Sequence, residues 1–385
     1  MSLVTIQEES KQTTIPTATA AQLEWVKKQA PLFVPPAEDP PAEAQVQDLL
    51  ADASMWKYAG FGIGEEATYL MLLSLKALAV SKGAEVRFWG KLVTRSGDYF
   101  IAETKTTEFP EDITKFEMEG TDGPNKYTYL VSKSPSDAAS WVELPHVTPA
   151  QIVAARQIKR FLTGDLAAPV SSFPPFPGGK EENLMRAMIA QITSETVLSL
   201  SGLLKAGEDE VNEILPNDED EAPPAKSIDE LKELSCWVHA ELDINAVGRT
   251  QKTPLPEGDD GEPIEPEEPD EAPKLPLESI DGDLEAEKPT WVLRTCPSGA
   301  GFSVNSVVVA KSLKWPGACA VALGNKVTNV YMGFGVAKSS GVYQPPAPKA
   351  VQAEWVAPEE EEGPGGFPLE KDDVTVKPEE PTEDE

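Results

Sequence analysis

The chain contains few of the side chains from which catalytic and metal centres are most often built. It has three cysteines and two histidines in 385 residues. Scattered cysteines in this number make no disulfide framework, and two histidines leave almost no material for a His-based triad or a multi-histidine metal site. Cys236 and His239 have the spacing of half a zinc site, but no second Cys/His pair follows. We therefore expect no enzyme activity, no metal and no cofactor.

Basic residues are also scarce, with 33 Lys and Arg against 65 Asp and Glu, for a net charge of -32. The deficit is uneven: residues 51–206 hold 18 acidic and 16 basic side chains, and nearly all the excess acid lies outside them. Acidic flanks repel phosphate backbones and anionic lipid heads. Nucleic acid and membrane surfaces are therefore excluded as expected partners.

Long apolar runs are missing as well. The most apolar stretch, 67–80, is interrupted by Thr68, Ser74 and Lys76, and it is shorter than the roughly 18 to 20 residues that cross a bilayer. It predicts a buried helix. The first ten residues have no basic region followed by an apolar one. We expect a reduced, cytoplasmic protein.

Proline and acid are abundant instead, and they divide the chain. The 36 prolines and many of the acids gather in stretches that lack large apolar side chains, and such stretches bury too little surface to fold alone. The remainder predicts an α+β fold, a single mixed core with antiparallel strands and several helices, plus disordered acidic, proline-rich arms. The expected parts are a mobile arm at 1–55 with a short docking segment, including a helix at 20–29; a core at 56–250; an acidic, proline-rich linker at 251–289; a β-rich part of the core at 290–345; and an acidic disordered tail at 346–385.

Sequence patterns within the core predict its elements. Glu65 and Glu66 suit the start of a helix to about residue 81, and Thr148 with Pro149 starts another that Gly164 ends. β-Branched and aromatic runs around a glycine turn predict a hairpin at 85–104. Further strands are expected at 126–131, 237–243 and 304–334, and a further helix at 181–192.

The predicted strand at 85–94 has two different faces. By strict alternation Val86, Phe88 and Leu92 share one face, and Trp89 lies on the other with Arg87 and Lys91. The second face is amphipathic. We expect it to be available to a partner.

Two further patterns could carry chemistry. Glycines at 60, 62 and 64 precede a helix, but their spacing departs from phosphate-binding loops and no strand comes before them, so a flexible helix entry is the simpler interpretation. Arg156, Lys159 and Arg160 form a basic cluster on one face of the predicted helix. They either bind an acidic tail of this or a neighbouring subunit or form an ordinary solvated face.

Several motifs in one order resemble the radial spoke head protein 4/6 family. The central one is ELPHVTPAQI at 143–152, followed by FLTG at 161–164 and FPPFPG at 173–178. The others are FWGK at 88–91, DYFIAE at 98–103, WVH at 237–239, GR at 248–249, WPGA at 315–318 and YMG at 331–333. The chain departs from the family at Phe334, where the family usually has Trp, and by one extra residue after Gly178.

The resemblance implies a non-catalytic structural subunit of the radial spoke head, in the axoneme of cilia and flagella. It implies assembly with radial spoke protein 9-like and MORN-repeat radial spoke protein 1-like subunits, with a paralogue or second copy, and with a radial spoke protein 3-like stalk. Contact with central-pair projections would be transient. The rival interpretation is a cytosolic adaptor outside cilia whose acidic tails bind a basic partner. The expected interface residues are Trp89, Trp237 and Trp315 as aromatic anchors, with Arg156, Lys159 and Arg160, although tryptophans more often pack in a core.

Overall fold

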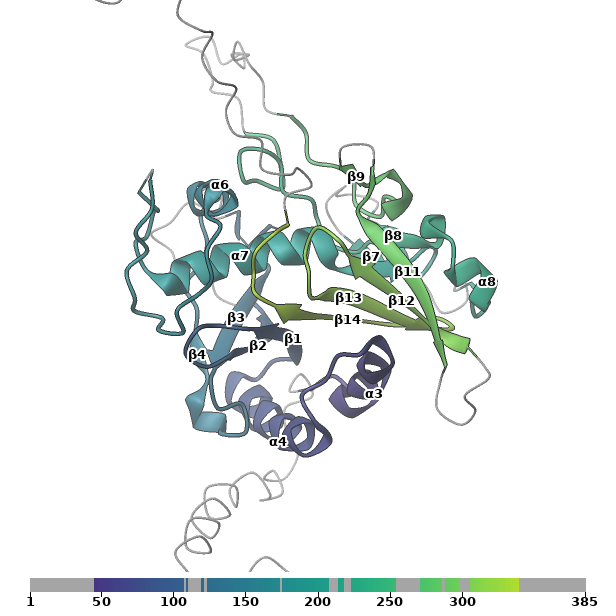
Figure 1. Ribbon diagram of the computed structural model, residues 1–385, viewed down its shortest axis with the longest axis horizontal. Coiled ribbons are helices and arrows are strands. Elements are labelled where there is room, and N and C mark those ends of the chain that lie inside the picture. Colours follow the sequence, from purple (N-terminus) through teal and green to yellow (C-terminus); the bar gives the residue numbers. More distant parts are fainter. Residues whose placement is uncertain are drawn as a thin grey trace, which may run out of the picture. The chain divides into compact units, whose positions relative to one another are not determined.

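A computed structural model gives the architecture of the chain (Figure 1). It describes residues 45–106, 109, 119–120, 123–173, 175–207, 214–217, 223–253, 271–285, 288–297 and 305–338. These residues form one α+β unit, as the sequence predicts, with a large mixed sheet at its centre and helices packed on both of its faces.

The sheet has eight strands in the order β11-β12-β13-β14-β1-β2-β3-β4. The first four come from the C-terminal part of the core and the other four from its N-terminal part. All neighbouring pairs are antiparallel except the central pair, β1 with β14, where Gly90 lies opposite Tyr331. The strands are β1 Val86–Leu92, β2 Tyr99–Lys105, β3 Tyr127–Ser132, β4 Val142–Glu143, β11 Trp291–Pro297, β12 Asn305–Ser312, β13 Ala318–Leu323 and β14 Lys326–Gly333.

Alternating side chains of these strands supply separate cores to the two faces. Val307 and Val309 of β12 pack with helices α3 (Leu49–Ala59) and α4 (Glu65–Lys82) on one face. On the opposite face, α6 (Pro149–Gln157) and α7 (Glu181–Thr196) cover the N-terminal half of the sheet. Val308 belongs to a third core there, beneath α8 (Ile228–Leu231) and η4 (Leu234–Cys236). The sheet is therefore buried on both sides.

Small elements complete the described part. Strand β8 (Trp237–His239) pairs with β5 (Leu198–Leu200), so the strand predicted at 237–243 is shorter and stands outside the large sheet. The remaining elements are β6 Leu204–Ala206, β7 Ile214–Pro216, β9 Leu284–Glu285, β10 Lys288–Pro289, η3 Ala138–Ser140 and η5 Ile280–Gly282.

The glycine-rich segment at 60–64 is the turn between α3 and α4. Gly60 ends α3 in the left-handed conformation, at a φ of 83°, and its N–H bonds back to the last turn. Gly64 precedes α4 with a φ of 90°. Both angles favour glycine for steric reasons. A helix entry, not a phosphate loop after a strand, therefore accounts for the pattern.

The expectation of an accessible face around Trp89 is wrong. The pairing of β1 with β2 shifts register between Phe88 and Gly90, which is a β-bulge. A bulge breaks strict alternation, so Trp89 and Leu92 both face α6 and α7, whereas Val86 and Phe88 face α3 and α4.

The predicted helix at 149–163 begins where expected but ends at Gln157 rather than at Gly164. Thr148 and Gln151 form the expected capping box. Beyond Gln157, tertiary hydrogen bonds replace helical ones: the N–H groups of Arg95 and Ser96, in the turn of the β1–β2 hairpin, bond to the carbonyls of Leu162 and Thr163. The hairpin turn therefore holds residues 158–164 in a non-helical path.

Two assigned arms are shorter than expected. Helix α3 begins at Leu49, inside the stretch assigned to the mobile arm, because Leu49 and Trp56 are buried against the sheet. Residues 271–285, assigned to the disordered linker, also have a fixed structure, since Ile280 is buried and Leu277 bonds to the backbone of His239. The predicted helix at 20–29 and the whole tail at 346–385 lie outside the described residues.

Candidate partner-binding site

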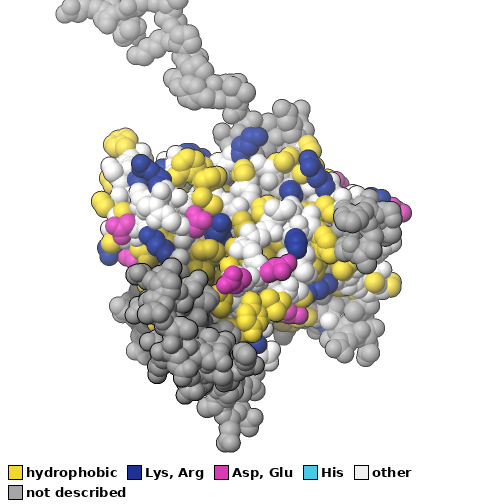
Figure 2. Space-filling model, turned by 60° about the horizontal axis from the view of Figure 1, so that its bottom comes forward, with side chains coloured by type: hydrophobic (Ala, Val, Ile, Leu, Met, Phe, Trp, Pro, Cys, Tyr) yellow, Lys and Arg dark blue, Asp and Glu magenta, His cyan; other side chains and the backbone are white. Residues whose placement is uncertain are grey.

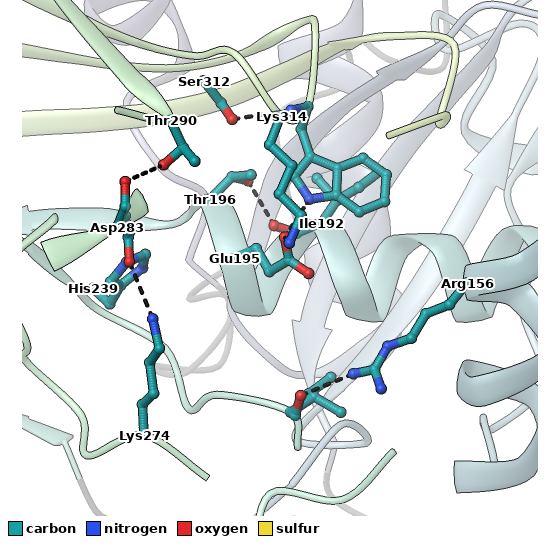
Figure 3. Close-up of polar contacts among 12 residues, drawn as sticks. Arg156, Ile192, Glu195, Thr196, His239, Lys274, Asp283, Thr290, Ser312 and Lys314 are labelled. Carbon is teal, nitrogen blue, oxygen red and sulfur yellow. Dashed lines mark hydrogen bonds and ion pairs between the residues drawn. The ribbon is translucent and has the colours of Figure 1, made fainter. Parts of the chain in front are cut away.

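A polar cleft of about 510 Å³ opens beside the C-terminal end of α7 (Figure 3). Its walls come from segments far apart in the sequence: the end of α7, residues 239–246, residues 271–284, the start of β11 and the turn at 312–315. Residues 271–285, which include η5 and β9 and are otherwise mostly irregular, line one side of the cleft, and we call them the strap. The strap therefore forms one wall of the cleft.

Asp283 of the strap is the centre of one hydrogen-bond network in the cleft. Its carboxylate accepts from His239 Nε2 at 2.7 Å, from Trp291 Nε1 at 3.0 Å and from Lys274 Nζ at 3.2 Å. Burial alone favours the neutral acid, but the hydrogen bond and charge of His239, the Trp291 hydrogen bond and the charge of Lys274 together lower the pKa of Asp283 to about 2. Asp283 therefore ties the strap to β8 and β11 as an anion.

A second network lies across the cleft, at the end of α7. Glu195 accepts from Lys314 Nζ at 2.6 Å and from the indole N–H of Trp315 at 2.7 Å. Arg156 of α6 points into the cleft, where its guanidinium donates to the carbonyls of Ile244 and Ala246 at 2.8 and 2.9 Å. Lys314 thus neutralises Glu195, whereas Arg156 donates to uncharged backbone carbonyls, and both bind groups of the same chain.

This arrangement indicates a structural junction more than a reaction centre. His239 bonds to a carboxylate that also holds an indole and an ammonium group, and its ring stands at an angle of 65° to that of Trp291. Within the described ranges, no group of three or more His, Cys, Asp or Glu side chains is placed to hold a metal ion. The network joins the strap, β8 and the sheet.

The three predicted tryptophan anchors are buried inside the subunit. Trp89 donates its indole N–H to Thr193 Oγ1, Trp237 to the carbonyl of Leu231, and Trp315 to Glu195. Of the three, Trp315 lines the cleft, while Trp89 and Trp237 belong to separate cores. All three rings pack inside the subunit, so none of them is exposed to a partner.

The predicted basic cluster is not formed on one helical face. Arg156 is on α6 and bonds inward to backbone carbonyls. Lys159 and Arg160 lie beyond the end of that helix, with Lys159 exposed and Arg160 half-buried. The sequence pattern predicts a helix that continues to Gly164. Because α6 ends at Gln157, the three side chains do not share a helical face.

Exposed aromatic side chains occur elsewhere. Phe161 and Phe334 contact each other with ring centroids 5.0 Å apart, yet they remain 55% and 50% exposed. Phe161 lies in the segment after α6, and Phe334 follows β14, so the pair joins the two halves of the core. Phe173 is almost completely exposed, whereas Phe176 of the same motif is buried. Sequence reasoning missed these residues as interface candidates, although all of them lie in or beside the motifs described above.

Fold and surface together describe a packed α+β protein with a polar cleft, whose charged side chains bind groups of the same chain, and with exposed aromatic rings. The comparisons with known proteins give its family. The profile of the radial spokehead-like protein family matches residues 4–122 and 106–380, and the chain belongs to that family. None of the helices in the described part of the chain is long and apolar enough to span a bilayer.

Individual relatives come from animals and an alga. The chain is 32% identical to human radial spoke head protein 4 homolog A over 376 residues, which cover 83% of this chain and 51% of the relative. It is 30% identical to mouse radial spoke head protein 6 homolog A, covering 86% of this chain and 56% of the relative. It is 33% identical to flagellar radial spoke protein 4 of Chlamydomonas reinhardtii, covering 83% and 73%. The chain thus spans about half the length of the two mammalian proteins.

Proposed function

We propose that this chain is a structural subunit of the radial spoke head in the axoneme of cilia and flagella, where it supports head assembly and helps to regulate motility. The observation that carries the proposal is the family match, which extends over nearly the whole chain and includes relatives named for the radial spoke in human, mouse and alga. The proposed role is non-enzymatic.

The architecture supports a scaffold role. A sheet buried on both faces is rigid, and the cleft residues Asp283 and Glu195 bind side chains of their own chain. Such a body can hold neighbours at fixed positions without an activated nucleophile. Docking then needs exposed apolar anchors, since buried aromatic side chains contribute most to interfaces. Phe161 and Phe334 are the pair that this chain offers.

The proposed neighbours are the other spoke head proteins. They include radial spoke protein 9-like and MORN-repeat radial spoke protein 1-like subunits, a paralogue or second copy of this chain, and a radial spoke protein 3-like stalk. Contact with central-pair projections is proposed to be transient. The alternative, an adaptor outside cilia, predicts expression in cells that never build an axoneme.

A capture experiment tests the proposal. The tagged full chain, added to an axonemal extract depleted of its own spoke head proteins, should capture those proteins. The Phe161→Ala/Phe334→Ala variant should capture at least about tenfold less, because each lost anchor costs about 2 kcal/mol or more. Its melting temperature should stay close to that of the unaltered chain, since both rings are half exposed.

Leu323→Ala is the matched control, because Leu323 is also an exposed apolar side chain but is the last residue of β13. It should leave capture unchanged. Failure of the unaltered chain to capture any spoke head protein would contradict the proposed function. Equal capture by the aromatic variant would instead move the interface away from Phe161 and Phe334.

A further inference from the structure

Helix α4 is apolar on two opposite sides. Its inner side packs on the sheet through Met71, Leu75 and Leu78. On its outer side Tyr69 and Val80 are 46% and 44% exposed, and half-buried Leu73 lies between them. Figure 2 brings the lower side of Figure 1, where α3 and α4 lie, toward the viewer, and the part of it that is visible shows apolar side chains interspersed with charged ones. A surface helix normally has a single apolar stripe, facing its core, so apolar side chains on the outer side of α4 offer a second packing surface.

The outer residues have the spacing of a helix-packing seam. Tyr69, Leu73, Lys76 and Val80 follow one another at intervals of four, three and four. Alternating intervals of four and three keep the four residues in one stripe along the helix. Helices that pack against each other in coiled coils have the same spacing. Lys76 fits because its methylene stem can cover apolar surface while its ammonium group stays in water. We call these four residues the α4 stripe.

We propose that the α4 stripe is the docking site for residues 20–34 of this same chain. This segment carries Leu23, Val26 and Ala30 at intervals of three and four, which is the complementary seam spacing, and it continues into Leu32-Phe33-Val34. It is the most apolar part of the sequence that precedes the described fold. Its apolar side chains match a stripe that the described residues leave open.

The point at which the chain enters the fold places this segment within reach. The N–H of Val86 donates to the carbonyl of Gln45 at 2.9 Å, and Val46 pairs with Val86. The described part of the chain therefore begins beside Val86, which follows the last residue of α4, Lys82, by four positions. Its first residues are therefore anchored near the C-terminal end of α4 in sequence, which is the end that carries Val80.

The linker has a matching length. Residues 35–44 include four prolines, and ten residues in an extended polyproline conformation span about 31 Å. Helix α4, with 18 residues, is about 27 Å long. The segment can thus reach every position on the stripe, and the short tether gives it an effective concentration of about 1 mM or more. A second copy of the chain has no such advantage.

Limited trypsin digestion of the full chain tests the proposal. Lys27 and Lys28 lie inside the docking segment, and Lys11 lies in the same arm outside it, so Lys11 serves as an internal control. Cleavage at Lys27 and Lys28 should be at least about tenfold slower than at Lys11, because proteolysis follows the undocked population. Both Tyr69→Gln/Val80→Gln and Leu23→Ser/Val26→Ser should remove this difference.

The segment variant leaves the folded core untouched, so it remains informative even if the α4 variant fails to fold. Equal cleavage at the three lysines in the unaltered chain would overturn the proposal. So would protection that survives in a folded α4 variant, because the segment would then dock elsewhere. Protection that increases with chain concentration would also overturn it, by assigning the stripe to a second copy.

Discussion

All the tryptophans in the described part of the chain have a hydrogen-bonded indole N–H. Each of the six donates its N–H to an acceptor, which removes the cost of an unpaired donor inside a core. Trp56, Trp89 and Trp141 use hydroxyl groups, Trp291 and Trp315 use carboxylates, and Trp237 uses a carbonyl. Most acceptors come from distant segments, so these rings fix the tertiary arrangement.

Trp89→Ala should therefore lower the free energy of unfolding by about 3 to 5 kcal/mol, through the cavity it leaves. The ring packs between Tyr129 and Tyr331 and donates to Thr193 at 2.9 Å. Trp89→Phe should cost less, because it keeps most of the packing and loses the hydrogen bond. Urea unfolding of the isolated chain measures both. Reduced capture of spoke head proteins with unchanged stability would instead make Trp89 an interface anchor.

The sequence could not have separated buried from exposed aromatic residues here. Trp89 and Phe161 are both apolar, and both lie in segments with some amphipathic character. What decides their positions is a register shift at Gly90 and the early end of α6, and both depend on partners far away in the chain. The sequence therefore indicates aromatic residues in both segments but does not tell which of them is buried and which is exposed.

At the scale of elements, the strap is the clearest departure from expectation. Acid and proline predicted disorder throughout 251–289, and local composition gives no other signal. Long-range contacts stabilise residues 271–285 instead: backbone bonds between Leu277 and His239, and the carboxylate of Asp283. By contrast, local signals predict α4, α7 and the β1–β2 hairpin: two glutamates in the first turn of each helix, Gly83 at the end of α4, and a glycine in the hairpin turn.

Asp283 should make the strap sensitive to acid. Because its pKa is lowered from 3.8 to about 2, its stabilisation is fully present above about pH 4 and is lost as the pH falls toward 2. Asp283→Asn should lower the free energy of unfolding at pH 7 by about 2 kcal/mol and flatten this acid-dependent loss. Urea unfolding between pH 2 and pH 7 measures it, with Asp281→Asn at an exposed neighbour as the control. Parallel stability curves for the Asp283→Asn variant and the unaltered chain would contradict the assignment.

Across the whole molecule, most of the excess negative charge lies outside the central part of the sequence. Residues 51–206, with 18 acidic and 16 basic side chains, are nearly neutral, and the excess acid belongs to other parts of the sequence. Exposed ion pairs contribute about 0 to 1 kcal/mol each, less than a buried aromatic anchor. We therefore expect apolar contact to hold the subunit in its assembly and charge to modulate transient encounters.

Salt should then have little effect on assembly. Capture of spoke head proteins should be similar at about 0.15 M and about 0.6 M salt, although the screening length falls from roughly 8 Å to about half of that. Deleting residues 346–385 should also leave capture intact while altering motility in a rescued mutant strain. Loss of the captured proteins at the higher salt would show that ion pairs hold the subunit.

The parallel pairing of β1 with β14 also constrains how the protein is made. Gly90 and Tyr331 lie 241 residues apart in sequence but side by side in the middle of the sheet, where a Cβ on Gly90 would collide with the carbonyl of Tyr331. At 5 to 20 residues per second, a ribosome needs roughly 12 to 50 s to synthesise the strand that completes this seam. Until then β1 is an open edge at the centre of the future sheet. A message cut short before β14 would thus yield a chain with an exposed, aggregation-prone strand instead of a smaller working subunit.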